Sequence, residues 1–399
     1  MRVLLTEGSG LTARQAATRL DAAGHTVEAL SSDPLALCRF TRHVRRLRKV
    51  PPYGADPFAW LEAALAHYQD GGFDLLLPTQ EQVAVLAAAP RRLASEGVRT
   101  VVPEFGALAR VQDKRSAVAT LAELGLPQPP FALDPDGWDR FPAFVKDPIG
   151  TASGGVRRVG SPAELATALA GRPPAVVQQA VDGPLAMVQT VFDHGTLVAF
   201  HACRREREGA NGGASHKRSL DLPDGRDAVA TLGSALGWHG ALSADVIVTG
   251  TGPSFIDLNP RLVEPENAWR AGVDLVGALV DLAGGGRPAP QAGGASGVAT
   301  HQLLLAVLGA AQHGGGRRGV AAELVAAWRR SGSYRGSAEE LTPTRGDRRA
   351  AVPVVAAALA TLVRPATWSA FADGSVANYA LTPGGWDRVR DSVGVSPRW

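Results

Sequence analysis

The first hundred residues alternate short apolar runs with segments of helical spacing. The apolar runs are Arg2–Thr6, Thr26–Leu30, Phe73–Leu77 and Arg99–Val102. Strand–helix alternation predicts a parallel sheet with helices on its faces, because each parallel connection has to cross back over the sheet. We therefore expect an N-terminal parallel α/β domain over residues 1–111.

A second region begins near Gln112 and contains both strands and helices. Strands are expected at Ala143–Lys146, Ala175–Gln179, Ala186–Phe192, Leu197–Arg204, Ser243–Val248 and Ser254–Leu258, the last two forming a hairpin. Helices are expected at Ser116–Leu124, Asp227–Leu236, Gln302–Ala311, Gly319–Arg330 and Val354–Leu362. The Gly-, Pro- and Ala-rich stretch at 284–297 indicates a loop or linker. The fold class expected is thus α/β followed by α+β.

Length and charge limit the kind of protein further. At about 150 residues per domain, 399 residues suggest two or three domains. The 41 basic and 38 acidic residues leave a net charge of only +3, which gives no case for a nucleic-acid partner. A dense basic run between Arg39 and Lys49 is better explained as a solvated loop or a contact between domains.

Cysteine content and hydropathy point to the cytoplasm. Two cysteines, Cys38 and Cys203, cannot make a disulfide framework, although one bridge remains open. The N-terminal apolar run is too short for a signal peptide, and no apolar run reaches the roughly 18 residues of a membrane-spanning helix. We therefore expect a cytoplasmic protein without a membrane partner.

The turn after the first apolar run is rich in glycine. The segment Gly8–Ala13 matches the loose G-x-G-x-x-G/A pattern of dinucleotide-binding turns, and Asp33 lies about 20 residues further on. This pattern supports a nicotinamide-dependent oxidoreductase. The alternative, which we favour, is a tight turn without a cofactor.

A lysine and a flexible loop follow one of the buried runs. Lys146 ends the run, and the Gly/Ser/Thr-rich segment Gly150–Gly155 comes directly after it. Glycines let backbone N–H groups approach phosphates, and a lysine adds a point charge. The chain has only four lysines (Lys49, Lys114, Lys146 and Lys217), which hints that each is retained for its compact charge. The alternative is a β-turn with an exposed lysine.

The expected hairpin carries two acidic residues. A turn near Thr251 places Asp245 opposite Asp257, or one position from it, and strand alternation places Asp257 and Asn259 on one face. Two facing carboxylates repel each other unless a cation lies between them, and Asp and Asn oxygens suit Mg²⁺. Arg261 follows at once, in position for a phosphate or an oxyanion. The alternative is an exposed acidic hairpin.

The order of these motifs resembles that of the ATP-grasp superfamily. The resemblance rests on Lys114, on Lys146 with its glycine loop, on the hinge-like segment Val176–Gly183 and on the hairpin ending at Arg261. It extends from about residue 1 to 290. It implies a pre-ATP-grasp domain at 1–111, an ATP-grasp domain at 112–290 with lobes at about 112–182 and 183–290, and a mostly helical C-terminal extension at 298–399.

The resemblance also implies residue roles. Phosphates would be held by Lys114 and Lys146, under a loop that contains Gly150, Ser153, Gly154 and Gly155. Adenine would be bound by Gln178, Gln179 and Val181, and Mg²⁺ by Asp245, Asp257 and Asn259. The transferring phosphoryl group would be stabilised by Arg261 together with Lys146. Two departures stand out. Asp257 replaces the usual glutamate, and Pro184-Leu185-Ala186 lacks the acidic residue that often holds the ribose.

The implied activity is that of a carboxylate–amine ligase. Members typically use MgATP to activate a carboxylate as an acyl phosphate, which an amine then attacks, releasing ADP and phosphate. The partners expected are small molecules, an amino acid or a small peptide among them, and a homodimer is possible. Two alternatives stay open: a non-catalytic nucleotide-binding protein of the same shape, and the oxidoreductase that Gly8–Ala13 suggests.

Charged residues near these motifs are candidates for substrate binding. They are Arg204, Arg205, Lys217, Glu264 and Glu266. An arginine can bind a carboxylate through two hydrogen bonds, and a glutamate can orient an amine. Surface charge on loops is the alternative for most of them. The aromatic residues Trp368, Tyr379, Trp386 and Trp399 are more often core anchors than ligand cages.

Overall fold

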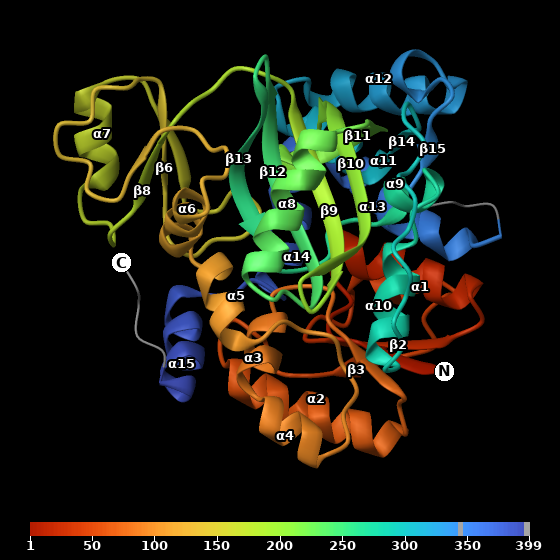
Figure 1. The fold of residues 1–399 in the computed structure, drawn as a ribbon. Coiled ribbons are helices and arrows are strands. Elements are labelled where there is room, and N and C mark those ends of the chain that lie inside the picture. Colours follow the sequence, from red (N-terminus) through yellow and green to blue (C-terminus); the bar gives the residue numbers. More distant parts are fainter. Residues whose placement is uncertain (342–345, 395–399) are drawn as a thin grey trace.

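The computed structural model describes residues 1–341 and 346–394, and its N-terminal part is a parallel α/β domain (Figure 1). Its sheet has the order β3-β2-β1-β4, with every pair parallel. The strands are β1 (Arg2–Leu5), β2 (Thr26–Ser31), β3 (Leu47–Lys49) and β4 (Leu75–Leu77). The predicted parallel α/β domain is therefore confirmed. The strand predicted at Arg99–Val102 is wrong: this segment has no strand structure, although the Arg99 carbonyl accepts a hydrogen bond from the Leu76 amide at 2.9 Å.

Five helices flank this sheet. They are α1 (Leu11–Ala22), α2 (Pro57–Gly71), α3 (Val83–Ala88), α4 (Pro90–Ser95) and α5 (Phe105–Gln112). Helix α2 shows why such helices begin and end where they do. The Asp56 carboxylate accepts hydrogen bonds from the amides of Phe58 and Ala59, and Gly72 ends the helix at a φ of 57°, which residues other than glycine rarely adopt.

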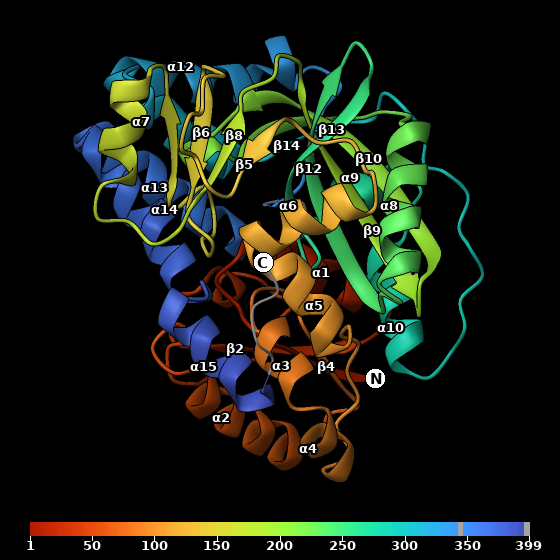
Figure 2. The same cartoon turned by 60° about the vertical axis from the view of Figure 1, so that its left-hand side comes forward.

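A small lobe follows, built on a second sheet of order β5-β8-β6-β7. Its strands are β5 (Phe131–Ala132), β6 (Ala143–Lys146), β7 (Val156–Val159) and β8 (Val176–Gln179), and its helices are α6 (Lys114–Glu123) and α7 (Pro162–Leu169). All three strand pairs are antiparallel. In Figures 1 and 2 its strands lie beside the edge of a larger sheet, while α6 packs against α5 of the N-terminal domain.

The larger sheet has seven strands in the order β13-β12-β9-β10-β11-β14-β15. The strands are β9 (Leu185–Asp193), β10 (Thr196–Glu208), β11 (Ala214–Ser219), β12 (Gly240–Thr249), β13 (Gly252–Asn259), β14 (Ala299–His301) and β15 (Ala338–Glu339). Helices α8 (Pro223–Ala235), α9 (Glu266–Arg270) and α10 (Leu275–Ala283) accompany it. Val188 and Phe192 pack in the core that holds α8, whereas Val191 belongs to the core shared with α10 and the N-terminal domain.

The C-terminal residues contribute both strands and helices. The helices are α11 (Leu303–Gln312), α12 (Gly316–Arg329), α13 (Ala351–Val363), α14 (Trp368–Ala377) and α15 (Pro383–Val393). Short 3-10 turns lie at η1 (Leu37–Arg39), η2 (Ala210–Gly212), η3 (Gly332–Tyr334), η4 (Arg348–Ala350) and η5 (Pro365–Thr367). Since β14 and β15 complete the seven-stranded sheet, the segment after residue 298 is joined to the large lobe by backbone pairing. The division into three domains stays a prediction.

Helix α15 packs on the N-terminal domain rather than on its neighbours in sequence. Trp386 is 3% exposed and lies with Leu381 and Val389 in the core that contains β4 and α3. Its ring is 5.8 Å from that of Phe105. Trp368 packs partly buried against α11, Tyr379 is buried, and the predicted role of Trp399 lies outside the described residues. No helix in the described ranges 1–341 and 346–394 is long and apolar enough to cross a membrane.

Replacement of Trp386 tests this docking. Trp386→Ala should lower the free energy of unfolding by about 3 kcal/mol, because it removes a large side chain from a packed core. Trp328→Ala is the control, since Trp328 is 81% exposed and its loss should cost almost nothing. Urea titration of both variants measures the difference. Equal stabilities would contradict the packing of α15.

Candidate active site

Most of the predicted site residues line one large cavity between the two lobes. Its volume is about 1280 Å³. The predicted residues in its wall are Lys114, Lys146, Gly150, Ser153, Gly154, Gln178, Gln179, Val181, Arg205, Lys217, Asp245, Asp257, Asn259, Arg261 and Glu264. Three predicted residues, Gly155, Arg204 and Glu266, are not in the wall. The structure thus brings residues from both lobes to one place.

The hairpin of β12 and β13 carries the acidic part of the site. Asp245 is directly opposite Asp257 in the strand register, and Asn259 follows two positions later on the same strand. Burial and, second to it, the charge of Asp257 raise the pKa of Asp245 to about 7, while Arg261 acts in the opposite direction. A pair of carboxylates held this close needs a cation, and these oxygen ligands fit Mg²⁺.

Lys146 ends β6, and its side chain contacts the neighbouring strand β8, the hinge-like strand of the small lobe. Its ammonium group donates hydrogen bonds to the Gln178 side-chain oxygen and to the Ile256 carbonyl, both at 2.6 Å. Burial lowers its pKa to about 8, while the charge of Asp257 favours the protonated form. A single lysine therefore connects β6, β8 and β13 at the floor of the cavity.

Lys114 begins α6 and faces the glycine loop. Its ammonium group donates to the Gly150 carbonyl at 3.1 Å and lies 3.8 Å from an Asp257 carboxylate oxygen. Gly150 has no room for a side chain, because a Cβ there would lie 2.2 Å from the Gly154 carbonyl oxygen. Gly155 is held outside the cavity wall by a hydrogen bond from the Asp147 amide to its carbonyl.

Arg261 is held by the N-terminal domain. Its guanidinium donates to the Glu81 carboxylate at 3.0 Å, and both side chains are largely buried. The same Glu81 carboxylate accepts hydrogen bonds from Thr151 of the glycine loop and from Gln112. Glu81 therefore connects the arginine, the loop and the N-terminal domain.

The glycine turn after β1 is filled by a protein carboxylate. Glu7 accepts hydrogen bonds from the amides of Ser9 and Gly10, at 2.6 Å and 2.9 Å. In a dinucleotide-binding turn these amides would receive the pyrophosphate. A Cβ on Gly10 would lie 2.7 Å from the Gln80 amide nitrogen, so the glycine serves close packing. This geometry favours the tight turn over the oxidoreductase.

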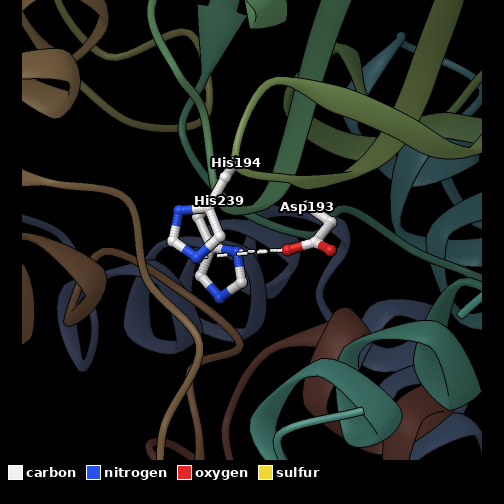
Figure 3. Close-up of side chains that lie close together, drawn as sticks. All are labelled: Asp193, His194 and His239. Atoms are coloured by element: carbon white, nitrogen blue, oxygen red, sulfur yellow. Dashed lines mark ion pairs between the residues drawn. The ribbon is translucent and has the colours of Figure 1, made fainter. Parts of the chain in front are cut away.

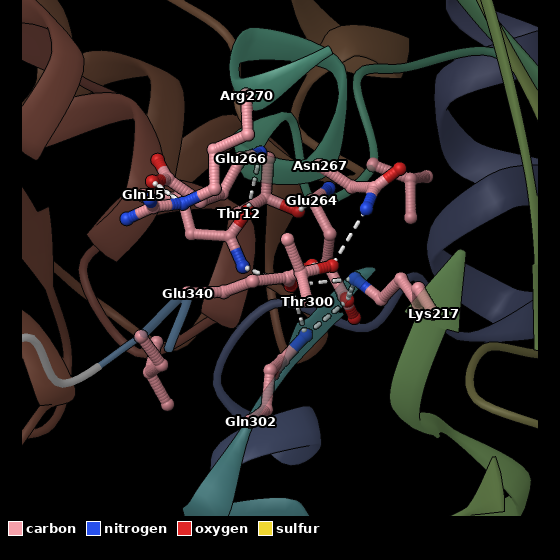
Figure 4. A network of polar contacts seen from close by, with 12 residues as sticks. Thr12, Gln15, Lys217, Glu264, Glu266, Asn267, Arg270, Thr300, Gln302 and Glu340 are labelled. Atoms are coloured by element: carbon pink, nitrogen blue, oxygen red, sulfur yellow. Dashed lines mark hydrogen bonds and ion pairs between the residues drawn. The ribbon is translucent and has the colours of Figure 1, made fainter. Parts of the chain in front are cut away.

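Lys217 and Glu264 belong to a buried polar network (Figure 4). The Lys217 ammonium forms ion pairs with Glu264 and, at 2.7 Å, with Glu340. Gln302 donates to both carboxylates, and Thr300 donates to Glu340 at 2.5 Å. Burial opposes the charge on Lys217, but the two carboxylates outweigh it and hold its pKa above the usual range. The network joins β11 to β14 and β15 and aligns Glu264 at the cavity.

Of the remaining substrate candidates, one lines the cavity and two do not. Arg205 lines the cavity, whereas Arg204, one residue away, points to the other side of β10 and pairs with Glu206. Glu266 forms ion pairs with Arg19 and Arg270 away from the cavity. Neither Arg204 nor Glu266 is placed to meet a ligand in the cavity.

The chain resembles solved structures in fold. A biotin carboxylase–β-γ-ATP complex from Campylobacter jejuni aligns with a TM-score of 0.59 at 17% identity, over 73% of this chain and 72% of that one. The L-amino acid ligase from Bacillus licheniformis gives 0.55 at 16% identity, over 71% and 73% of the two chains. The fold of this chain is the ATP-grasp fold.

A further solved structure has a similar fold, whereas comparisons by sequence find no match. N5-carboxyaminoimidazole ribonucleotide synthetase from Thermotoga maritima shares the ATP-grasp fold with a TM-score of 0.53 at 15% identity, over 75% of this chain and 79% of that one. No protein-family model matches the sequence, and no curated protein matches it by sequence. The likeness is therefore one of structure.

Three residues of the site were not anticipated from the sequence. Glu7 and Glu81 follow the carboxyl ends of β1 and β4, and Tyr379 follows α14. A signal for the first two was available, since polar residues directly after parallel strands gather at the edge where ligands bind. Tyr379 gave no such signal, because nothing local relates it to the cavity that it lines.

A cluster of two histidines and an aspartate lies outside the cavity wall (Figure 3). Asp193 is the last residue of β9, His194 lies in the turn that follows, and His239 precedes β12. The imidazole rings stack at 4.2 Å, and Asp193 lies 3.5 Å from His239. Burial lowers the pKa of His239, and His194 lowers it further. The cluster is at the end of β9 opposite to Leu185 and Met187, which line the cavity.

Glu7 makes the stability of this chain depend on pH. Burial raises its pKa from 4.5 to about 7, so the folded state holds a proton that the unfolded state releases. Its stabilising contribution is complete below about pH 4.5 and is lost as pH rises through 7. Relative to Glu7→Gln, the wild type should lose about 3 kcal/mol of unfolding free energy between pH 4 and pH 8. Urea titrations across this range measure the difference, and parallel pH profiles would contradict the assignment.

Proposed function

We propose that this protein is an ATP- and Mg²⁺-dependent ligase that joins a carboxylate to an amine. The observation that supports it most is the arrangement around the hairpin. Two facing carboxylates, Asp245 and Asp257, lie in one cavity with Lys114, Lys146 and Arg261. This combination suits a metal-bound polyphosphate, since the lysines and the arginine meet its negative charge and the carboxylates hold its cation.

The nucleotide base would lie against the strand β8. Gln178 is 2% exposed, and its side-chain nitrogen has no hydrogen-bond partner among the described residues, so it is available to a purine. The Gln179 amide already donates to the Pro130 carbonyl, which leaves the Gln179 carbonyl and the Val181 amide for the base. Apolar neighbours in the wall, among them Met187, would cover its faces.

Asp245, Asp257 and Asn259 would hold the metal ion. When bound there, Mg²⁺ neutralises phosphate charge and helps the γ-phosphoryl group accept a nucleophile. Lys114 and Lys146 would hold phosphate oxygens, and the loop at Gly150–Gly154 would cover them. Arg261, positioned by Glu81, would stabilise charge on the transferring group.

The reaction then needs no nucleophile from the protein. A carboxylate oxygen of the substrate attacks the γ-phosphorus, the bond from that phosphorus to the β–γ bridging oxygen breaks, and ADP leaves. The amine nitrogen attacks the acyl carbon, the bond from that carbon to the phosphate oxygen breaks, and phosphate leaves as the nitrogen loses a proton. The protein positions the reactants and neutralises charge. Cys38 and Cys203 are buried, and burial raises the pKa of each thiol to about 12, so neither suits nucleophilic attack.

We also propose the classes of substrate, the cellular location and the oligomeric state. A small-molecule carboxylate and an amino acid or small peptide as the amine fit the size of the cavity, and a cytoplasmic location fits the use of ATP. The biotin carboxylase domain of Hydrogenobacter thermophilus 2-oxoglutarate carboxylase, described as a dimer with MgADP and bicarbonate, aligns with a TM-score of 0.59 at 16% identity. A homodimer is proposed for this chain on that likeness.

Asp257→Ala should abolish ADP release while the fold is retained. The variant removes one of the two facing carboxylates and with it the metal-binding pair. The measurement is ADP release from MgATP with pooled amino acids and dipeptides. Asp227→Ala, an exposed aspartate on α8, is the control and should keep full activity.

Two outcomes would count against the ligase. An unchanged rate in Asp257→Ala would refute the metal-binding role of the hairpin. Absence of ADP release by the wild type with every pool, together with thermal stabilisation by MgATP, would favour the nucleotide-binding protein without catalysis.

Lys146→Ala should raise the ATP concentration needed for half-maximal rate by at least about tenfold, because a charge-assisted hydrogen bond is lost. Lys49→Ala is the matched control, since Lys49 is exposed on β3. Steady-state rates over a range of ATP concentrations measure the effect. An unaltered ATP dependence would mean that Lys146 does not contact the nucleotide.

A further inference from the structure

One end of the cavity is lined by apolar side chains that the proposed reaction does not use. They come from the C-terminal helices and form what we term the apolar wall: Leu304, Leu305 and Leu308 of α11, Val352 and Ala356 of α13, and Phe371 of α14. The leucines are the surface of a packed core that also holds Val354 and Ala357. The wall is therefore backed by a core rather than by loose chain.

The apolar wall and the proposed nucleotide position lie next to different strands of the seven-stranded sheet. The hairpin of β12 and β13 is at one edge of the seven-stranded sheet, whereas β11 and β14 lie toward the other. Helix α11 packs on β11 and on η2, at the side away from the hairpin. The metal-binding residues and Arg261 would thus lie between a nucleotide and a second ligand.

Two residues of the wall are unusually accessible for their type. Val352 is 46% exposed and Phe371 is 38% exposed, although both line the cavity. A charged pair elsewhere in the cavity lining, Arg205 and Glu208, is internally matched at 3.3 Å. An apolar ligand group would cover the exposed carbons, and a charged group would find no unmatched partner in this pair.

Helix α14 connects the apolar wall to the reacting groups. Phe371 is in its first turn, and Tyr379 follows its last turn. Burial raises the pKa of the Tyr379 hydroxyl above its usual range, and among the charged groups near it Arg261 acts most strongly. The side chain of Ser375, between the two aromatic residues, donates to the Ser9 carbonyl at 2.8 Å and fixes the helix on the N-terminal domain.

We propose that the carboxylate substrate carries an apolar side chain, which binds against the apolar wall. The inference rests on the proposed ligase function, because it places the substrate carboxyl group beside Arg261. The cavity is continuous from that group to the wall. The wall thus selects the substrate, while the polar centre performs the chemistry.

A series of amino acids of increasing side-chain size tests this subsite. The rate of ADP release from MgATP is measured with one amino acid at a time as the carboxylate, beside a fixed mixture of amines. From glycine through alanine and 2-aminobutyrate to leucine, kcat/KM should rise about fourfold per methylene group. Aspartate and lysine should be poor substrates. Equal or faster turnover with glycine, aspartate or lysine would overturn the proposal.

Two valines on one helix supply a matched pair of variants. Val352→Asn changes a residue of the apolar wall, and Val355→Asn changes a residue that is 51% exposed and does not line the cavity. The first should lower the preference for leucine over alanine several-fold, and the second should leave it unchanged. Identical preferences in both variants would refute the role of the wall.

A binding measurement separates this inference from the ligase proposal. If no amino acid causes ADP release, the ligase proposal fails, and thermal stabilisation is then measured with each amino acid in the presence of a non-hydrolysable MgATP analogue. Stabilisation by leucine and phenylalanine beyond that by glycine would support the apolar subsite. Equal stabilisation by all of them, or by none, would overturn it.

Discussion

The repulsion between two carboxylates organises the centre of this molecule. Asp245 and Asp257 are fixed opposite each other by the register of a hairpin, so neither can move away without loss of strand pairing. Lys114 and Lys146 approach from the small lobe, and Arg261 from the end of the hairpin. The large lobe therefore supplies the two carboxylates and one cation, the small lobe supplies two further cations, and these charges meet in the cavity between the lobes.

Much of this centre could be predicted because its determinants are local. The position of the turn near Thr251 sets which residues face each other, and a period of two sets which of them share a face. The lysine that ends β6 and the glycine loop after it are contiguous in sequence. The same local logic distinguishes Arg205 from Arg204, and counting strand parity would have excluded Arg204 before the structure was known.

The remainder could not be predicted because it depends on pairs that are far apart in the chain. Glu81 meets Arg261 across 180 residues, and Lys217 meets Glu340 across 123. Local sequence patterns do not indicate such pairs, since the residues that flank each partner form no distinctive motif. The strands β14 and β15 were missed for a related reason: they have three and two residues, too few to show alternation. The segment after residue 298 was therefore expected to be mostly helical, without the two strands that complete the large sheet.

Residues 9–14 and residues 347–378, which are far apart in sequence, are bound together beside the cavity. The Asn378 side chain donates to the Ser9 hydroxyl, and Arg14 forms a buried ion pair with Asp347 at 3.2 Å. During synthesis Ser9 leaves the ribosome 369 residues before Asn378, and Arg14 leaves it 333 residues before Asp347, so these contacts form late. The sheet of the small lobe can form earlier, because its four strands all lie within residues 131–179. The apolar wall is completed only after residues 303–371 have been made, so this end of the cavity forms later than the small lobe.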